Sequence, residues 1–314
     1  MSEEPSLKIA VIGVGAMGSL FGGRLSKVTP VWLVDPWEEH VAAMQREGLH
    51  LVTPEGDEDV IPVQATTDLG QVPPCDLAII FVKAHQTAWA AEQAARLLAP
   101  DGLALTLQNG LGNAEVIARF VGEARTVQGV TAQGATLLGP GRVRHAGRGP
   151  THIASRPEVA DRLAVVAETF NRAGLETHLV REGLESMVWG KLIINVGINA
   201  LTALLRVPNG VIAQVPEVWA LAEEAVNEAV AVAQALGISL PYDDPPARVR
   251  AVAQATAANL SSMLQDVRRG APTEIEAING AVVREGERLG VPTPLNTCLV
   301  RLIRAVEATA SVVL

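Results

Sequence analysis

Apolar residues fall into two patterns along the chain, and the change between them divides it into two parts. Up to about residue 181, short apolar runs of strand length alternate with segments of helical periodicity. Such alternation is typical of a parallel sheet with helices on both faces. Beyond residue 181, strand patterns nearly vanish, and helices are predicted at 184–205, 217–236, 247–268, 274–289 and 297–308. We therefore predict an α/β chain, with a doubly wound sheet in residues 1–181 and an all-α domain in residues 182–314.

A glycine-rich turn follows the first predicted strand, residues 7–12, and leads into a helical pattern. The turn reads Gly13-Val-Gly15-Ala16-Met17-Gly18. In this pattern the first glycine makes the tight turn, the second lets the backbone approach a pyrophosphate, and the third lets the helix pack on the strand. The free N–H groups of the helix N-terminus then favour an anion. The first domain is therefore predicted to be Rossmann-type and to bind NAD(P)H through the residues of this turn.

Asp35 closes the second predicted strand, residues 30–34. A carboxylate at this position can accept hydrogen bonds from the adenosine ribose hydroxyls, and it repels a 2′-phosphate. At about 4 Å, repulsion between like charges costs roughly 1 to 4 kcal/mol, and the next basic residue is Arg46. We predict that Asp35 favours NADH over NADPH. The alternative is that Asp35 only caps the next helix.

Two polar residues follow apolar strands at the carboxyl edge of the predicted sheet. Lys83 comes directly after the strand at 76–82, and Asn109 follows the strand at 103–107 in a Gln-Asn-Gly turn. Side chains just past the carboxyl ends of parallel strands line the ligand crevice of doubly wound folds. We expect Lys83 to contact the cofactor and Asn109 to reach the cofactor or the substrate. The alternatives are a surface lysine and an ordinary Asn-Gly turn.

The helix predicted at 184–205 is apolar on almost every face, as expected of a helix in a protein core. Lys191 is the only charged residue between positions 187 and 205, and Lys191, Asn195 and Asn199 are four residues apart and project from one side. A lysine is rarely buried without a partner, so this side should face a ligand-filled cleft rather than solvent. All six histidines precede residue 181. Lys191 is therefore the candidate proton donor of the helical domain, the alternative being a solvated surface lysine.

Two further segments of the helical domain carry polar residues. Asn259-Leu-Ser-Ser262 places small polar residues on the helix at 247–268, and Thr273-Glu274 opens the helix at 274–289. On periodicity alone, Thr273 to Glu276 could be only a capping box, with Glu274 a solvated acid of the first turn. The pattern by itself leaves both interpretations of Glu274 open.

Composition restricts the classes of function. The chain has 314 residues, 48% of them hydrophobic and 19% charged, which predicts two well-packed domains. A net charge of −9 without a Lys/Arg-rich run argues against nucleic acid or a membrane as partner. Cys75 and Cys298 fit no metal spacing, and the N-terminus Met-Ser-Glu-Glu-Pro is not a secretory signal. We expect a cytoplasmic protein that binds a small molecule and no metal. The helical half has enough apolar surface for a homodimer.

Seven segments together resemble the ketopantoate reductase (2-dehydropantoate 2-reductase) family. They are the GxGxMG turn, Val-Lys83-Ala, Gln-Asn109-Gly, the block from Trp189 to Leu204, Pro208-Asn-Gly210, Asn259-Leu-Ser-Ser262-Met-Leu-Gln-Asp and Thr273-Glu274-Ile-Glu-Ala-Ile-Asn-Gly280. The likeness extends from about residue 7 to about residue 305. The resemblance implies reduction of the 2-oxo acid 2-dehydropantoate to (R)-pantoate, for pantothenate and coenzyme A synthesis, usually with NADPH.

The resemblance also implies a role for each polar residue. Lys191 would be the general acid that protonates the carbonyl oxygen as hydride reaches C2, and Glu274 would bind the product hydroxyl and orient the lysine. An ammonium beside a developing alkoxide supplies both charge stabilisation and a proton, and an opposing carboxylate keeps a desolvated lysine charged. The other residues would bind substrate or cofactor: Asn259 and Ser262 the carboxylate end, Asn195 and Asn199 other polar groups of the substrate, and Lys83 and Asn109 both cofactor and substrate.

The second strand departs from the family's pattern. The family usually carries a basic residue near the end of this strand for the 2′-phosphate, whereas this chain has Val34 and Asp35. An NAD-dependent D-2-hydroxy-acid dehydrogenase on the same scaffold therefore remains an alternative. A second alternative, from another class, is a non-catalytic protein that senses a dinucleotide.

Overall fold

The computed structural model describes residues 7–311, and the chain divides into two compact units. The first comprises Met1–Gln108 and Asn113–Leu184, and the second comprises Asn109–Gly112 and Glu185–Leu314. The sequence placed the domain boundary after residue 181, and the assignment of cofactor to one domain and substrate to the other stays a prediction. The acidic N-terminal residues from which a secretory signal was excluded lie outside the described residues.

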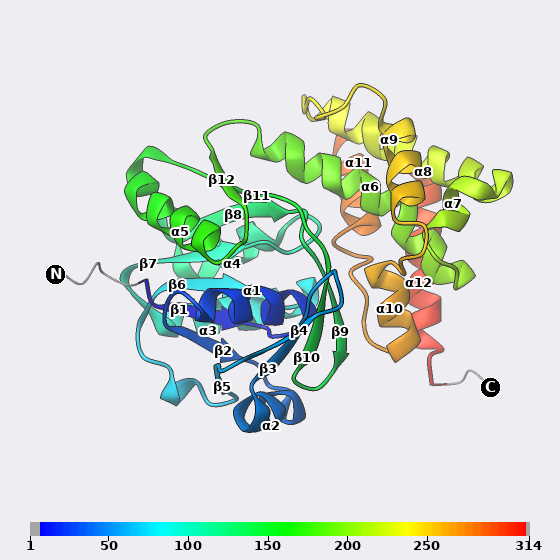
Figure 1. Cartoon of the computed structure of the whole chain (residues 1–314). Helices are drawn as coiled ribbons and strands as arrows, with labels where there is room; N and C mark the ends of the chain where they lie inside the picture. Colours follow the sequence, from blue (N-terminus) through cyan, green and yellow to red (C-terminus); the bar gives the residue numbers. More distant parts are fainter. Residues whose placement is uncertain (1–6, 312–314) are drawn as a thin grey trace. The chain divides into compact units, whose positions relative to one another are not determined.

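An eight-stranded sheet forms the centre of the first unit (Figure 1), in the order β12-β11-β8-β7-β6-β1-β2-β5. Its strands are β1 (Ile9–Ile12), β2 (Val31–Val34), β5 (Gln64–Thr66), β6 (Cys75–Ile80), β7 (Leu98–Thr106), β8 (Thr126–Thr131), β11 (Thr151–Ala154) and β12 (Thr177–Val180). All neighbouring pairs are parallel except β8 and β11. Because β1 lies between β2 and β6, the strand order reverses there, and ligands of doubly wound folds bind at such a switch point.

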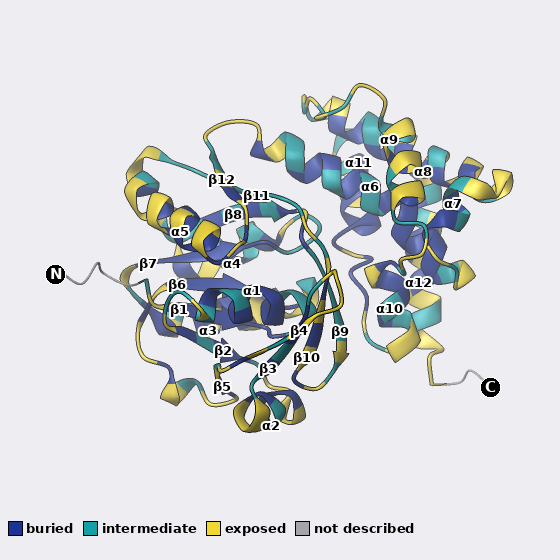
Figure 2. Ribbon diagram, viewed as in Figure 1, coloured by how far each residue is buried: buried dark blue, intermediate teal, exposed yellow. Residues whose placement is uncertain are grey.

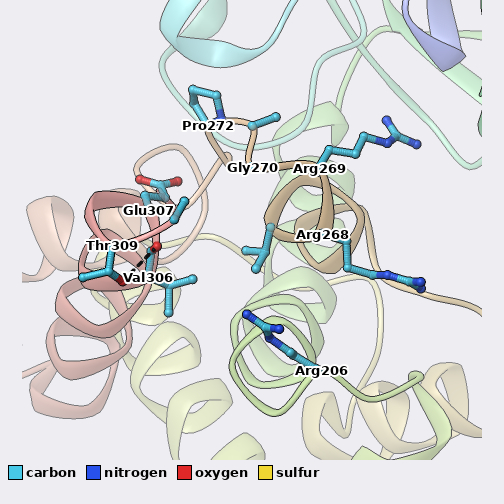
Figure 3. A pocket seen from close by; sticks show the side chains of 11 residues that line it. Arg206, Arg268, Arg269, Gly270, Pro272, Val306, Glu307 and Thr309 are labelled. Carbon is cyan, nitrogen blue, oxygen red and sulfur yellow. Dashed lines mark hydrogen bonds between the residues drawn. The ribbon is translucent and has the colours of Figure 1, made fainter. Parts of the chain in front are cut away.

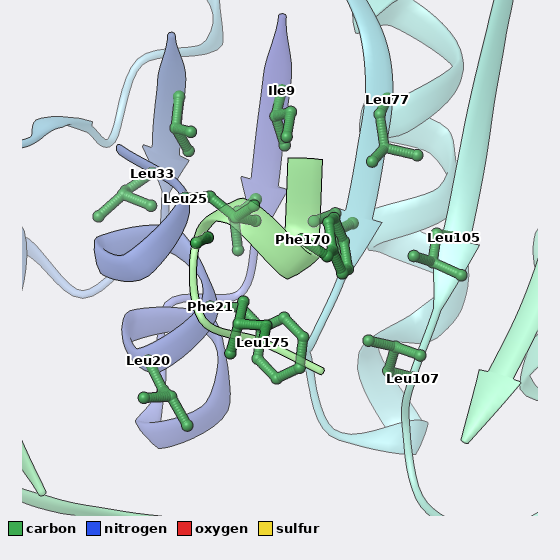
Figure 4. Packing of buried hydrophobic residues seen from close by; sticks show 14 of the residues in the cluster. Ile9, Leu20, Phe21, Leu25, Leu33, Leu77, Leu105, Leu107, Phe170 and Leu175 are labelled. Atoms are coloured by element: carbon green, nitrogen blue, oxygen red, sulfur yellow. The ribbon is translucent and has the colours of Figure 1, made fainter. Parts of the chain in front are cut away.

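Helices cover both faces of this sheet because alternate residues of each strand point to opposite sides. Ile9 and Val11 of β1 belong to one apolar cluster, together with residues of α1 (Ala16–Ser26) and α5 (Ala160–Arg172). Figure 4 shows two aromatic rings of this cluster, Phe21 of α1 and Phe170 of α5, whose ring centroids are 5.9 Å apart. On the other face, residues of α3 (Thr87–Leu97) and α4 (Asn113–Val121) pack in a second cluster. The strands are buried while the helices expose their outer sides (Figure 2), which confirms the doubly wound prediction.

The rest of the first unit is a second sheet with short connecting elements. After α2 (Glu38–Glu47), the strands β3 (Leu49–Val52) and β4 (Glu58–Ile61) form an antiparallel hairpin. They join β9 (Gly134–Gly139) and β10 (Arg142–Gly147) in the order β4-β3-β10-β9. The 3₁₀ helices are η1 (Leu69–Gln71), η2 (Ala84–Gln86), η3 (Glu123–Arg125) and η4 (Pro157–Val159).

Helices around their own apolar core make up the second unit. They are α6 (Leu184–Leu205), α7 (Gly210–Gln214), α8 (Pro216–Ala235), α9 (Pro245–Ala255), α10 (Ser262–Arg269), α11 (Asn279–Leu289) and α12 (Pro294–Ala308). By length and composition α6 could cross a membrane, but 72% of its apolar stretch is buried inside the protein. The helix predicted at 184–205 is therefore part of a core.

Two of the predicted helices are wrong in extent. The helix expected at 247–268 is interrupted between α9 and α10, because the carbonyls of Ala257 and Asn259 accept hydrogen bonds from Gly210 and Asn209 at the start of α7. The helix expected at 274–289 begins only at Asn279. Residue 274 forms a bend and residues 275–278 form turns instead, so Glu274 is not a solvated acid in the first turn of a helix.

Candidate active site

The glycine turn leaves room for an anion at the start of α1. Gly13 has φ +89°, and a Cβ added there would stand 2.6 Å from the backbone nitrogen of Val82. A Cβ at Gly18 would stand 2.0 Å from the carbonyl oxygen of Gly13, so both positions exclude a side chain. A Cβ at Gly15 would meet nothing within 4 Å. This open space lies beside the free backbone N–H groups at the start of α1, whose first two residues are Ala16 and Met17. The turn therefore fits a pyrophosphate.

The carboxylate of Asp35 holds this turn in place. Its Oδ2 accepts a hydrogen bond from the backbone N–H of Val14 over 2.6 Å, and its Oδ1 accepts one from Trp37 over 2.9 Å. Trp37 is the N-cap residue of α2. The side chain of Asp35 therefore has a local structural role at the start of this helix, which was the alternative to a role in cofactor binding. Each carboxylate oxygen accepts more than one hydrogen bond, so a ribose hydroxyl can still be accommodated.

Gln108 connects the carboxyl ends of β6 and β7. Its Nε2 donates to the carbonyl of Val82 over 2.7 Å and to the hydroxyl of Thr87 over 2.9 Å. Half-buried Lys83 follows Val82 and is the N-cap residue of η2. Gln108 was not among the site residues predicted from the sequence, although a long polar side chain directly after a buried strand was a usable signal.

On α6, the polar stripe lies at the margin of the apolar core. Lys191 and Asn195 are half-buried, and Asn199 is 6% exposed. Burial lowers the pKa of Lys191 to about 8, and the nearby Glu274 carboxylate opposes part of this decrease. The ammonium end is therefore desolvated although the residue keeps some exposed surface. A lysine in this state is still mostly charged at pH 7 and is a stronger acid than a lysine in water.

Glu274 is held by residues 109–112, which group with the helical unit. Its side chain is 7% exposed, and its Oε2 accepts a hydrogen bond from the Asn109 amide over 3.5 Å. The backbone N–H of Leu111 donates to the carbonyl of Ala277 over 3.0 Å. The structure thus brings Asn109 to Glu274, and Glu274 close enough to Lys191 to act on its charge.

Two consecutive serines at the start of α10 have different surroundings, which the sequence could not reveal. Ser261 is buried, and its hydroxyl accepts from the N–H of Leu264 over 3.1 Å and from the hydroxyl of Thr202 over 2.7 Å. Ser262 and Asn259 are exposed. Ser261 is therefore the structural cap of α10, whereas Ser262 and Asn259 have surface open to a ligand.

Asn209, of the Pro208-Asn-Gly210 segment, is a further candidate that was not predicted individually from the sequence. Its Nδ2 donates to the hydroxyl of Thr256 over 3.0 Å. Among the described residues its buried Oδ1 has no hydrogen-bond partner. Because its backbone N–H donates to the carbonyl of Asn259, Asn209 lies beside the segment that leads into α10.

A cavity of about 650 Å³ in the helical unit contains none of the predicted site residues (Figure 3). Arg206 lies directly after α6, and Arg268 and Arg269 end α10, where cations offset the partial negative charge of a helix C-terminus.

Within residues 7–311, no group of three or more His, Cys, Asp or Glu side chains could hold a metal ion.

Comparison with known proteins identifies the family. The family described as ketopantoate reductase PanE/ApbA matches residues 9–158, and the one described as its C-terminal part matches residues 184–307. The chain belongs to the ketopantoate reductase family. The resemblance found in the sequence is therefore confirmed, and with it the class of oxidoreductase.

Relatives and solved structures agree with this assignment over nearly the full chain. The 2-dehydropantoate 2-reductase of Halobacterium salinarum is 40% identical and aligns over 96% of this chain and 99% of its own length. The 2-dehydropantoate 2-reductase of Pyrococcus abyssi is 36% identical and aligns over 96% of this chain and 98% of its own length. A PanE/ApbA family ketopantoate reductase structure from Ralstonia eutropha JMP134 has a TM-score of 0.89 at 33% identity, covering 97% of this chain and 100% of that chain. A D-mandelate dehydrogenase structure with NADH and anilino(oxo)acetate has a TM-score of 0.88 at 29% identity, with the same coverage.

Proposed function

We propose that this ketopantoate reductase reduces 2-dehydropantoate to (R)-pantoate with a nicotinamide cofactor, as a step towards pantothenate and coenzyme A. The observation that carries the proposal is a desolvated lysine, Lys191, that lies close enough to the buried carboxylate of Glu274 in the same helical unit for that charge to raise its pKa. Relatives at 33 to 40% identity are named for this reaction. A protein that only senses a dinucleotide would have no use for such a pair.

Lys191 is the general acid of the proposed reaction. When bound, the reduced nicotinamide cofactor would supply the hydride that C2 of the 2-oxo acid accepts. As negative charge develops on the carbonyl oxygen, the Lys191 ammonium stabilises it and transfers a proton, so that an O–H bond forms and a neutral amine remains. The lowered pKa of about 8 favours this transfer, and the carboxylate of Glu274 keeps the lysine protonated beforehand.

Glu274 orients the reacting groups. Its buried carboxylate can accept a hydrogen bond from the hydroxyl that the reduction creates, while its charge acts on the Lys191 ammonium. The amide of Asn109 approaches the same carboxylate through its Nδ2. Asn109 can therefore position Glu274 as well as contact substrate or cofactor.

Amides and a hydroxyl of the helical unit bind the rest of the substrate. Asn195 and Asn199 follow Lys191 along one side of α6, where they can reach polar groups near the reacting carbonyl. Exposed Ser262 and Asn259 lie at the N-terminal end of α10 and hold the substrate carboxylate, which the helix N-terminus also favours.

In the first unit, the turn from Gly13 to Gly18 cradles the pyrophosphate, and Lys83 contacts the cofactor. Asp35 accepts hydrogen bonds from the ribose hydroxyls and favours NADH over the family's usual NADPH. Exposed Glu38 and Glu39 at the start of α2 add negative charge close to Asp35, which supports this preference.

Assembly and location are the remaining parts of the proposal. Exposed Val215, Leu221 and Leu302 supply apolar surface on the helical unit for a homodimer. The cytoplasmic location of the enzyme stays a prediction, since the cytoplasm is where a soluble metabolic reductase would act.

The substrate is tested by comparing catalytic efficiencies. The purified protein is assayed with 2-dehydropantoate and with bulky and aromatic 2-oxo acids, each with NADH and with NADPH. We expect kcat/KM to be highest for 2-dehydropantoate. A higher value for an aromatic 2-oxo acid would support the D-2-hydroxy-acid dehydrogenase alternative, and dinucleotide binding without turnover of any 2-oxo acid would support a sensing protein.

A further inference from the structure

An exposed indole stands next to the carboxylate proposed to bind the ribose. Trp37 is 37% exposed, and its backbone N–H donates to Oδ1 of Asp35 over 2.9 Å. Single exposed apolar side chains are common on protein surfaces and need no explanation by themselves. Trp37 differs from such residues in that its ring is held in one orientation.

The imidazole of His40 holds the indole. The two rings are stacked, with centroids 4.8 Å apart and an interplanar angle of 8°. His40 is fully buried, its Nδ1 accepts from the N–H of Gly141 over 2.9 Å, and its Nε2 lies 3.2 Å from the hydroxyl of Ser19. Because a backbone N–H can only donate, Nδ1 carries no proton and Nε2–H donates to Ser19, whose hydroxyl donates to the carbonyl of Val14. Desolvation lowers the pKa of His40, which favours this neutral form.

His40 is thereby tied to α1, to the glycine turn and to the turn between β9 and β10. One face of the Trp37 indole rests on this fixed ring. The other face is therefore presented in a constant orientation as a flat aromatic surface. Surfaces of this kind bind other flat rings by offset stacking.

We propose that the outer face of Trp37 is the stacking surface for the adenine ring of the cofactor. The inference rests on the proposed function in one respect, namely that the glycine turn holds an adenine dinucleotide. The adenine is attached to the ribose whose hydroxyls Asp35 would bind, and Trp37 is the aromatic residue whose backbone N–H donates to that same carboxylate. Stacking does not depend on a 2′-phosphate, so Trp37 would contribute affinity to both nucleotides while Asp35 distinguishes between them.

Adenosine 5′-monophosphate and nicotinamide mononucleotide are the two halves of the cofactor, and their separate affinities distinguish contacts with the adenosine from contacts with the nicotinamide. Calorimetric titration of the full-length protein with each half gives the dissociation constants. Trp37→Ala should weaken binding of the adenosine half by roughly 5- to 100-fold, as expected for loss of one base–aromatic stack, and should leave binding of the nicotinamide half unchanged. Phe120→Ala, which removes a ring that is 42% exposed on α4 of the same unit, is the matched control and should change neither value.

An adenosine monophosphate affinity for Trp37→Ala within twofold of the wild-type value would overturn the inference. Equal losses for both halves would overturn it as well, because an adenine contact cannot weaken the nicotinamide half. Trp37→Phe keeps a ring at the position and serves if the alanine variant does not fold. The change in tryptophan fluorescence on binding adenosine monophosphate should then be smaller than in the wild type, and an unchanged signal would contradict the stack. Neither ligand involves 2-dehydropantoate, so a failure of the proposed reaction would leave these outcomes intact.

Discussion

The amide of Asn109 donates a hydrogen bond to the carboxylate of Glu274, a residue 165 positions further along the chain. The backbone beside this contact is equally close, since the N–H of Leu111 donates to the carbonyl of Ala277. Glu274 lies in a segment without regular secondary structure. Its position therefore depends on a short segment that follows β7 in the sequence.

Gly110→Ala should disturb this arrangement specifically. Gly110 has φ +85°, and an added Cβ would stand 2.4 Å from the carbonyl oxygen of Ala277. Gly112→Ala is the matched control, because Gly112 has φ +89° but a Cβ there meets nothing within 4 Å. Both variants carry backbone strain of roughly 1 to 3 kcal/mol, whereas only Gly110→Ala should also displace Glu274 and lower kcat, by about tenfold or more. Urea denaturation and steady-state kinetics measure the two effects, and equal losses of kcat in both variants would show that the contact with Ala277 is unimportant.

The two serines before α10 should have separable effects. Ser261→Ala removes the N-cap of α10 and the acceptor of the Thr202 hydroxyl, so the free energy of unfolding should fall by about 1 to 2 kcal/mol. Ser262→Ala changes an exposed side chain and should raise KM for 2-dehydropantoate while leaving stability within about 0.5 kcal/mol of the wild type. A Ser262→Ala enzyme with unchanged KM would remove Ser262 from the substrate site.

Asp35→Asn tests the cofactor preference with a side chain of the same shape. The amide keeps one of the two oxygens that accept backbone hydrogen bonds and lacks the charge that repels a 2′-phosphate, so the ratio between the two cofactors is the quantity to compare. We expect the wild type to use NADH with the higher kcat/KM. In the variant, the efficiency with NADPH relative to NADH should rise by roughly one to three decades. If the wild type prefers NADPH and the substitution leaves the ratio unchanged, Asp35 does not select the cofactor.

The pH dependence of the reduction should report the protonation of Lys191. Because the general acid must be protonated, kcat/KM should be constant below a pH of about 8 and should fall tenfold per pH unit above it. Glu274→Gln removes the charge that raises the pKa of Lys191, so the decline should begin at a lower pH in this variant. A profile that stays flat up to pH 10 would mean that another group donates the proton.

Local patterns were sufficient for the fold and for the stripe on α6. The spacing of Lys191, Asn195 and Asn199 requires only helical geometry, and the order of strand, glycine turn and helix identified the nucleotide fold. Contacts between distant segments were not accessible in the same way. The helix break between α9 and α10 depends on hydrogen bonds to the start of α7, and the burial of Glu274 depends on residues 109–112. Periodicity within one segment carries no information about either contact.

The most direct test of the account is the turnover of Lys191→Ala with saturating 2-dehydropantoate and cofactor, measured beside Lys27→Ala. Lys27 is a surface lysine of the first unit, where it pairs with Asp59, so its substitution should leave kcat unchanged. For Lys191→Ala we predict a kcat lower by roughly two to four decades, with the dissociation constant of the reduced cofactor unchanged. A Lys191→Ala enzyme that turns over at nearly the wild-type rate would contradict the central claim that this lysine is the general acid.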